Sequence, residues 1–437
     1  MNKNPRKIYS KEEVEKATLN YFNGDSLATD VWIRKYCLKD EKNYYELTPD
    51  DMHHRIADEL ARIEAKYPNG LNSEQIYETL KQFKRIVPQG SPMSGIGNDF
   101  QIVSLSNCFV IGNNGESDSY GGILKIDQEQ IQLMKRRGGV GHDLSHIRPS
   151  GSPVKNSAIT STGIVPFMRL YSEVTSVIGQ GGRRGALMLS VDINHPDSPE
   201  FITAKQDLTQ ITGANISVKI SNDFMKAVEN NHDYLLHWPV DTPLTDFQKE
   251  QFLEQCESYN HLYSTTYKDK PLYIKKISAK TLWDLLISCS WKTAEPGIMF
   301  WDRMVDYAPD GVYEEHKSIS TNPCSEIGMG AYDSCRLISV NLFNCVSNPF
   351  TSFAKISFPK LADMFYIAQC MGDTLVDLEL QNIEKLIQTT NGDESELWKK
   401  VYEVGKNGRR TGVGFTGYGD MLAALNVPYG DVYTTSL

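Results

Sequence analysis

The sequence predicts an α/β protein in which a parallel sheet follows a helical layer. Between about Ser10 and Phe83, apolar residues recur at three- and four-residue spacing, which is typical of amphipathic helices. After that region, short apolar runs that read as strands alternate with helical patterns, as in a parallel α/β architecture. The stretch 86–100 is rich in proline, glycine and serine, so we expect a helical domain at 1–85 and an α/β domain at 86–437.

Each expected element rests on a local pattern. Ser10 and Glu13 have the spacing of a capping box, which predicts the start of the first helix. The stretch 259–273 is polar and aromatic, and we expect a surface insertion there. The expected helices lie at 10–22, 52–67, 73–83, 127–139, 165–179, 222–230 and 278–295, and the expected strands at 104–112, 186–193 and 215–221.

Length and composition exclude several classes of protein. A chain of 437 residues can form one large barrel domain or two to three ordinary domains. The net charge of -10 argues against a nucleic-acid or membrane-surface binder, although a local basic site for a phosphate ligand stays open. The N-terminal residues lack the apolar core of a signal peptide, and no apolar run is long enough for a membrane span. We therefore expect a cytoplasmic protein.

Two glycine-rich stretches lie at junctions between expected elements. Gly138, Gly139 and Gly141 form one, and the other, 179–186, includes Arg183 and Arg184. Backbone amides in such turns can bind phosphate, but neither stretch has the spacing of a Walker loop or a dinucleotide fingerprint. Plain connections are the commoner use of such turns, and the paired arginines favour an anion at the second.

His142 and His146 flank Asp143, which invites a metal-site interpretation. The two histidines would share one face only if this segment were helical, and no further cysteine or histidine lies nearby in the sequence. We predict no metal site.

The cysteines fall into two groups. Those with apolar neighbours in helical patterns are expected to pack in the core: Cys37, Cys256, Cys289 and Cys370. Cys345 follows a strand-like run and has no evident partner. Cys108, Cys324 and Cys335 have polar neighbours, which suit a thiol that does chemistry. Eight cysteines in this length are too few for a disulfide scaffold.

Three uses are open to the thiols with polar neighbours. A zinc site would need four ligands in close pairs, which the spacing does not supply. A hydrolytic thiol would need a histidine base, which the sequence alone leaves open. The third use is a radical or redox set, in which Glu326, two residues after Cys324, could act as a general base on the same side of an extended loop.

Together these residues resemble the large catalytic subunit of ribonucleotide reductase. The motifs SLSNCFVI, RRGGVGHDLSHIRPSGSPVKNS, GGRRGALM, TGANISVKISNDFM, TNPCSEI, DSCRLISVNL and GRRTGVGFTGYGDML occur in the family's order from about Ile86 onward. The resemblance implies a ten-stranded α/β barrel with a central finger loop, of which this chain carries the N-terminal part after a helical layer. It also implies reduction of ribonucleotides to deoxyribonucleotides, as in a ribonucleoside-diphosphate reductase.

By resemblance, Cys324 is the thiyl-radical position in the finger loop. Glu326 would accept the 3′-hydroxyl proton of the ribose, and the Asn322 amide would hold the ribose hydroxyls. Cys108 and Cys335 would be the redox pair that reduces the 2′ position and ends as a disulfide.

Binding residues also carry over from the family. The substrate site would consist of Ser91, Asn107, Cys108, Gly139, Asn322, Pro323, Cys324, Ser325 and Glu326. The site for a dNTP or ATP effector would consist of Asp118, Ser119, Arg148, Arg183 and Arg184, and would control which base fits the active site.

The resemblance further implies cofactors and partners. The motifs look closest to adenosylcobalamin-dependent members, and the alternative radical source is a separate dimetal subunit. We expect a ribonucleoside di- or triphosphate substrate, a thioredoxin- or glutaredoxin-type reductant, a homodimer, and no membrane or nucleic-acid partner. The chain stops before several barrel strands of the family, so we expect a fragment or a split half that needs a second chain. A non-catalytic nucleotide-binding regulatory or assembly subunit is the alternative.

Overall fold

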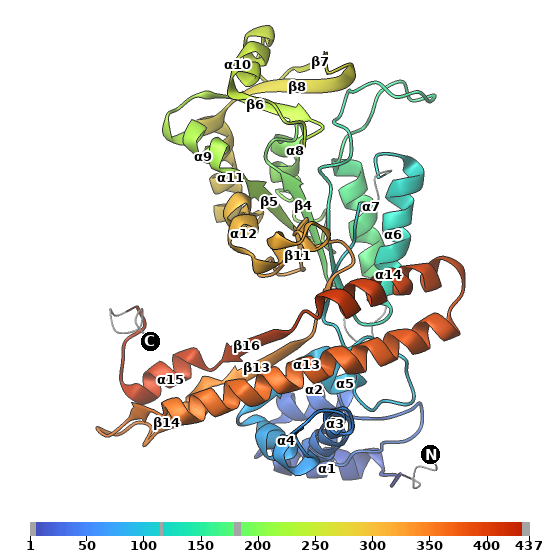
Figure 1. The fold of residues 1–437 in the computed structure, drawn as a ribbon, viewed down its shortest axis with the longest axis vertical. Coiled ribbons are helices and arrows are strands. Elements are labelled where there is room, and N and C mark those ends of the chain that lie inside the picture. Colours follow the sequence, from blue (N-terminus) through green and yellow to red (C-terminus); the bar gives the residue numbers. More distant parts are fainter. Residues whose placement is uncertain (1–5, 114–116, 179–184, 431–437) are drawn as a thin grey trace. The chain divides into compact units, whose positions relative to one another are not determined.

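The structure is a computed structural model that describes residues 6–113, 117–178 and 185–430 (Figure 1). The chain forms two compact units, one from 1–107 and 334–437 and the other from 108–333. These units describe how the chain packs, and the expected division into domains at 1–85 and 86–437 stays a prediction.

The first unit begins with helices where the sequence predicts them. Ser10 and Glu13 form the expected capping box, and a second box joins Thr48 and Asp51. The 73–83 stretch does not stay helical throughout, because α4 ends at Leu80, where Lys81 has a non-helical ψ of 127°, and Gln82 and Phe83 then have positive φ angles of 55° and 56°. The helices of this region are α1 (Lys11–Tyr21), α2 (Ser26–Lys35), α3 (Pro49–Glu64), α4 (Ser73–Leu80), the 3-10 turn Lys81–Phe83 and α5 (Gly90–Gly95).

A small mixed sheet and two long helices complete this unit. Strand β13 (Leu337–Asn341) lies between β1 (Ile86–Pro88), which is antiparallel to it, and β16 (Gly412–Thr416), which is parallel. Helix α13 (Phe358–Thr389) packs along β13 and β16 and against α14 (Gly392–Gly408) (Figure 1). The remaining elements are β12 (Ser334–Cys335), β14 (Val346–Ser347), β15 (Lys355–Ile356), the 3-10 turn Leu342–Cys345 and α15 (Tyr418–Leu425).

One hydrophobic core joins these parts of the first unit. Met52 and Ile56 from α3 share it with Ile338 and Val340 from β13 and with Met371 from α13, and all are fully or almost fully buried. Residues near the start of the chain thus pack against residues that follow them by more than two hundred positions, which buries apolar surface that neither segment could cover alone.

The second unit is built on a parallel sheet. Its strands lie side by side in the order β2 (Cys108–Val110), β3 (Gly139–Asp143), β4 (Leu187–Asp192), β5 (Asn215–Ile220) and β9 (Gly297–Phe300). Its helices are α6 (Tyr120–Met134), α7 (Val165–Val177), α8 (Ser198–Thr203), α9 (Asn222–Glu229), α11 (Ala279–Thr293) and α12 (Trp301–Tyr307), with 3-10 turns at Pro309–Val312 and Glu314–His316. Helices α6 and α7 pack together beside β3 and β4 (Figure 1).

This architecture agrees with the predicted α/β class. Among the described residues, hydrogen bonds do not close the strands into a barrel, so the ten-stranded barrel stays a prediction. The expected strands at 104–112, 186–193 and 215–221 are confirmed as the shorter β2, β4 and β5.

The polar stretch 259–273, where we expected a surface insertion, is exposed or half-buried up to Pro271 and contributes strands to a second sheet. Strands β6 (Asp233–Trp238), β8 (Lys270–Ser278) and β7 (Leu262–Tyr267) form an antiparallel sheet in that order, with α10 (Asp246–Gln255) packed on it. Leu272 and Ile274 of β8 are buried against Leu235 and Cys256. The polar composition of this stretch did not indicate strands. Their partner, β6, precedes α10 in the sequence and is not evident from the stretch itself.

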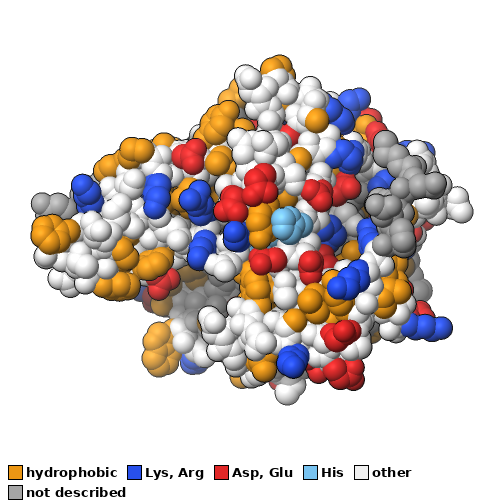
Figure 2. All heavy atoms as spheres, turned by 90° about the horizontal axis from the view of Figure 1, so that it is seen from below, with side chains coloured by type: hydrophobic (Ala, Val, Ile, Leu, Met, Phe, Trp, Pro, Cys, Tyr) orange, Lys and Arg blue, Asp and Glu red, His pale blue; other side chains and the backbone are white. Residues whose placement is uncertain are grey.

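The face shown in Figure 2 carries charges of both signs, as expected for a chain with a net charge of -10. Acidic and basic side chains are interspersed over the face shown in Figure 2, between small hydrophobic areas. No helix among the described residues is long and apolar enough to cross a membrane.

Candidate active site

The predicted finger loop is a short hairpin, which we define as residues 320–329. Strands β10 (Ser320–Thr321) and β11 (Gly328–Met329) pair antiparallel. Asn322 closes the loop above them, because its backbone N–H donates to the Ile327 carbonyl at 3.2 Å and its side-chain oxygen accepts from the Ile327 N–H at 3.1 Å. Ser325 has a φ of 67°, which turns the chain sharply at the tip.

Side chains of the parallel sheet hold the tip of this hairpin. The Asn215 amide donates to the Pro323 carbonyl at 2.9 Å. The hydroxyls of Ser217 and Ser325 lie 3.0 Å apart. Both of these anchors come from β5, and the Ser325 hydroxyl also lies 3.9 Å from the Met188 sulfur on β4, so two neighbouring strands hold the tip.

At the tip of the hairpin, two side chains are exposed and two are buried. Cys324 and Glu326 are exposed, whereas Asn322 and Pro323 are buried. An exposed thiol next to an exposed carboxylate is open to a substrate or a radical source, while the buried pair fixes the backbone that carries them.

Cys108 lies against this loop. It is the first residue of β2 and is buried, and its sulfur is 3.6 Å from the side-chain nitrogen of Asn322. The structure therefore places Cys108 beside Asn322, which follows it by 214 positions and belongs to the same hairpin as Cys324 and Glu326.

Cys335 belongs to the other compact unit. Its side chain is 1% exposed, and a Cβ atom at Gly412 would lie 2.5 Å from its sulfur. Its carbonyl accepts from the Asn107 backbone N–H at 2.9 Å, and the Asn107 side-chain oxygen lies 3.4 Å from the Leu337 nitrogen. Gly412 thus leaves the space that the thiol occupies, and the pairing of Cys335 with Cys108 stays a prediction.

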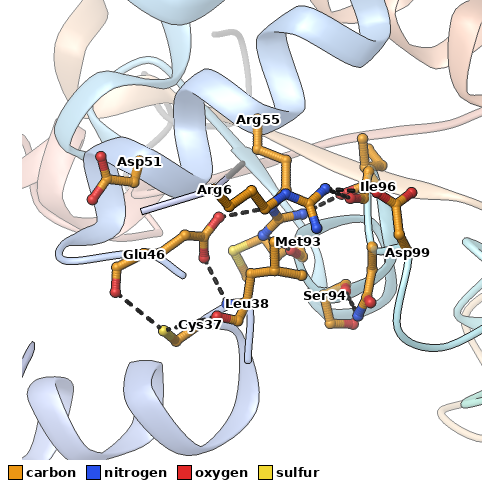
Figure 3. A network of polar contacts seen from close by, with 12 residues as sticks. Arg6, Cys37, Leu38, Glu46, Asp51, Arg55, Met93, Ser94, Ile96 and Asp99 are labelled. Atoms are coloured by element: carbon orange, nitrogen blue, oxygen red, sulfur yellow. Dashed lines mark hydrogen bonds and ion pairs between the residues drawn. The ribbon is translucent and has the colours of Figure 1, made fainter. Parts of the chain in front are cut away.

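Ser91 lies on the short helix α5, which a buried ion pair holds in place (Figure 3). Arg55 binds Glu46 at 2.7 Å and donates to the carbonyls of Met93 and Ile96 at the end of α5. The Ser91 hydroxyl is buried, and among the described atoms it has no hydrogen-bond partner. A buried hydroxyl of this kind suits a ligand contact.

Three of the predicted effector residues, Asp118, Ser119 and Arg148, line a cavity of about 880 Å³. Ser119 caps α6, and its side chain accepts from the Gly122 N–H at 3.0 Å. Asp118 accepts from the Arg148 backbone N–H at 2.7 Å and from its guanidinium at 2.9 Å. This ion pair was not expected, and it orients Arg148 toward the cavity wall.

Sequence reasoning missed one wall of this cavity. Trp238 and Tyr273, from β6 and β8, line it with Lys270, and their rings lie 5.9 Å apart. The Arg148 guanidinium lies 5.9 Å from the Trp238 ring. The only feature of the sequence that could have indicated this aromatic wall was the run of aromatic residues at 259–273. The predicted Arg183 and Arg184 lie outside the described residues.

The glycines of the first glycine-rich stretch serve close packing. A Cβ atom at Gly141 would lie 1.8 Å from the Thr321 carbonyl oxygen, and one at Gly138 would lie 2.4 Å from the Phe109 ring. The substrate-site candidate Gly139 begins β3 and is buried. Gly141 therefore lets the hairpin approach β3, a role that the two interpretations from the sequence did not include.

His142 and the remaining cysteines behave as interior residues. His142 lies in strand β3 rather than in a helix, and its Nε2 is 3.1 Å from the Gln130 side-chain oxygen. Among the described residues no cluster of three or more histidine, cysteine or acidic side chains could hold a metal. Core packing is confirmed for Cys37, Cys256 and Cys289, Cys345 is also buried, and Cys370 is only half-buried.

Known proteins are similar in sequence to this chain over most of its length. The family described as "Ribonucleotide reductase, barrel domain" matches residues 106–437. The chain is 26% identical over 406 residues to a vitamin B12-dependent ribonucleoside-diphosphate reductase of Mycobacterium tuberculosis, covering 92% of this chain and 51% of that relative. It is 29% identical over 355 residues to a protein of the same name from Thermoplasma acidophilum, covering 81% and 39%.

A further relative carries a different name. The chain is 25% identical over 339 residues to the ribonucleoside-diphosphate reductase subunit alpha of Chlamydia trachomatis, covering 74% of this chain and 29% of that relative. The chain thus spans about half the length of the Mycobacterium relative and less of the other two. Because the family match covers more than half of the chain and includes the whole 320–329 hairpin, this protein belongs to the ribonucleotide reductase family.

Proposed function

We propose that this chain carries the radical site of an enzyme that reduces ribonucleotides to 2′-deoxyribonucleotides. The observation that carries the proposal is the hairpin geometry, in which Asn322 holds the loop of Cys324 and Glu326 and also contacts the Cys108 sulfur. A protein that only bound nucleotides would have no need of this set of thiols, amide and carboxylate.

In the proposed reaction the Cys324 thiyl radical takes the hydrogen atom from C3′ of the ribose. Glu326 accepts the 3′-hydroxyl proton, and Asn322 holds the hydroxyls. The 2′-hydroxyl leaves as water. Cys108 and Cys335 supply two electrons, and their two protons go to the leaving water and to C2′ as the pair becomes a disulfide. Cys324 then returns its hydrogen atom to C3′, and Glu326 returns the proton.

The exposure of Cys324 supports an external radical source. Adenosylcobalamin, when bound, would supply the one-electron oxidation of the Cys324 thiol, and the names of the Mycobacterium and Thermoplasma relatives favour it. A separate dimetal subunit is the alternative. In either case the radical source must reach the Cys324 thiol, and the exposed tip of the hairpin permits this.

The other predicted ligands and partners form part of the same proposal. Ser91, Asn107 and Gly139 would contact a ribonucleoside di- or triphosphate, and a thioredoxin- or glutaredoxin-type protein would reduce the disulfide. A dNTP or ATP effector would occupy the cavity beside Asp118, Ser119 and Arg148, in a homodimer. Strand β16 is largely exposed and, in the described part of the chain, pairs only with β13, so further sequence or a second chain would complete the barrel there.

The test is a reduction assay with CDP and CTP, carried out on the complete enzyme with dithiothreitol, with and without adenosylcobalamin. Cys324→Ser should abolish deoxynucleotide formation and leave the circular dichroism spectrum unchanged, because the side chain is exposed. Cys256→Ser, a buried thiol of the β6–β8 sheet, is the matched control and should stay active. Full turnover in Cys324→Ser would overturn the radical assignment, and nucleotide binding without turnover in the unmodified enzyme would favour a regulatory subunit.

A further inference from the structure

A buried ion pair lies directly under the 320–329 hairpin. Lys219 on β5 and Asp143 at the end of β3 meet at 2.8 Å, and the side chain of each is 7% exposed. The Asp143 carboxylate also accepts from the Ser190 hydroxyl at 3.1 Å and from the Ser145 hydroxyl at 2.9 Å. A charge pair removed from water in this way persists only where its remaining hydrogen-bonding groups are satisfied, as they are here.

The pair is connected to the base of the hairpin at two points. The Lys219 ammonium donates to the Ile319 carbonyl at 3.2 Å, immediately before β10. The Ser190 hydroxyl, already bound to Asp143, lies 2.9 Å from the Ser320 hydroxyl. Strands β3, β4 and β5 therefore each supply one side chain to a network that ends on the two residues where the hairpin begins.

Aromatic packing fixes the lysine from another side. Its ammonium lies 4.9 Å from the centre of the Trp301 ring, at the start of α12. The ammonium thus contacts Asp143, the Ile319 carbonyl and this ring at once. Movement of Ile319 away from this position would break one of these contacts.

We propose that Lys219 and Asp143 act as positioning residues that anchor the hairpin carrying Cys324. They would not touch a substrate. Their effect would pass through Ile319 and Ser320 into the paired strands β10 and β11, and so set where Cys324 and Glu326 stand above the sheet. The importance of this position for catalysis rests on the proposed function, whereas the anchoring itself does not.

Hydrogen exchange measured by mass spectrometry on the full chain tests the anchor without turnover. The reporters are the amides of Ile319 and Asn322, which bond across the hairpin to Met329 and Ile327. In Lys219→Met we expect peptides covering 317–330 to exchange about tenfold faster or more, because the stem loses its charged donor while Asp143 stays buried. Lys219→Arg keeps the charge and should restore most of the protection.

Lys275 provides the matched control. It is on β8 of the same unit, its side chain is 8% exposed, and it pairs with Glu200 at 3.5 Å. Lys275→Met should leave exchange in 317–330 unchanged. Equal exchange in wild type and Lys219→Met, or the same acceleration in Lys275→Met, would overturn the proposal.

Ser190→Ala keeps the test decisive if Lys219→Met fails to fold. It removes the contact with Ser320 and leaves the ion pair in place, so we expect a smaller acceleration confined to the same peptides. No acceleration in Ser190→Ala would then overturn the anchor. Failure of the reduction assay would refute the proposed function alone, because these exchange rates do not depend on it.

Discussion

The side-chain nitrogen of Asn322 lies 3.6 Å from the sulfur of Cys108, although 214 positions separate the two residues. The same side chain closes the hairpin through the Ile327 N–H. A single amide therefore joins a strand of the parallel sheet to the loop that carries Cys324. This contact is the most direct structural support for placing Cys108 in the same site as Cys324.

Replacement of Asn322 by alanine should loosen this junction. The substitution removes the acceptor for the Ile327 N–H and the donor beside Cys108, and we expect a loss of about 1–3 kcal/mol in the free energy of unfolding. Urea unfolding followed by fluorescence measures it. Asn230→Ala is the control, because its amide bonds only to the Lys226 carbonyl on an exposed helix end. Equal losses in the two variants would contradict the junction role.

Gly141→Ala should be far more damaging than an ordinary glycine substitution. Its Cβ would lie 1.8 Å from the Thr321 carbonyl oxygen, so either β3 or the hairpin must move, at a cost of about 3 kcal/mol. Thermal unfolding checks this. In contrast, Gly121→Ala in α6 has only the Ser119 hydroxyl nearby, at 3.7 Å, and should be neutral or stabilising. Similar melting temperatures for both variants would show that the hairpin does not press on β3.

Glu379 on α13 should be essential for the stability of residues 104–106, the segment just before β2. It is fully buried and accepts from the hydroxyls of Ser104 and Ser106 and from the Leu105 N–H at 2.6 Å. Glu379→Ala should cost about 2–5 kcal/mol, because several buried donors lose their acceptor, and Glu379→Gln should cost less.

Urea unfolding and hydrogen exchange of peptides covering 103–107 measure the effect of Glu379→Ala. Glu384 is the control on the same helix, since it is exposed and bonds to the Tyr402 hydroxyl. Glu384→Ala should leave both readings near wild type. Unchanged exchange at 103–107 in Glu379→Ala would show that the carboxylate does not hold this segment.

Acid should destabilise the unit that contains β3. Burial lowers the pKa of His142 to about 3 and that of His146 to about 4. The unfolded chain, with a histidine pKa near 6.5, then binds protons that the folded chain does not, so stability present above pH 6.5 is lost as the pH falls toward these values. For His142 the loss at pH 5 is about 2 kcal/mol.

Melting temperatures measured between pH 5 and 7.5 test this dependence. His142→Gln keeps an amide that can reach Gln130 and removes the titration, so its melting temperature should fall less steeply with acid. His261→Gln, at an exposed position, should follow the wild type. A His142→Gln curve parallel to wild type would exclude this histidine as a source of acid lability.

Local signals sufficed for much of the fold. Local sequence determines the capping box at Ser10 and Glu13, because a cap bonds within one helical turn. It also determines strands β4 and β5, because a buried parallel strand is apolar throughout. Strands β7 and β8 were not predicted, because burial against Leu235 and Cys256 depends on a partner strand that the composition of 259–273 does not reveal.

In the candidate site, the sequence predicted proximity only for residues that share a short motif. Asn322, Cys324 and Glu326 lie within five positions, and the hairpin keeps them together. Lys219 and Asp143 gave no such signal, because a lysine in one strand and an aspartate in another meet only after the sheet has formed. Trp238, on the wall of the cavity beside Asp118 and Arg148, was missed for the same reason.

The 2.8 Å contact between Lys219 and Asp143 also constrains how the sequence can diverge. A related sequence that replaces only the lysine keeps a buried aspartate with no countercharge. One that replaces only the aspartate keeps a buried ammonium with no countercharge. Each single step is penalised, so the two positions should be exchanged together or retained together. Lys275 and Glu200 face no such restriction, since the glutamate can turn to water, and drift at those positions should be independent.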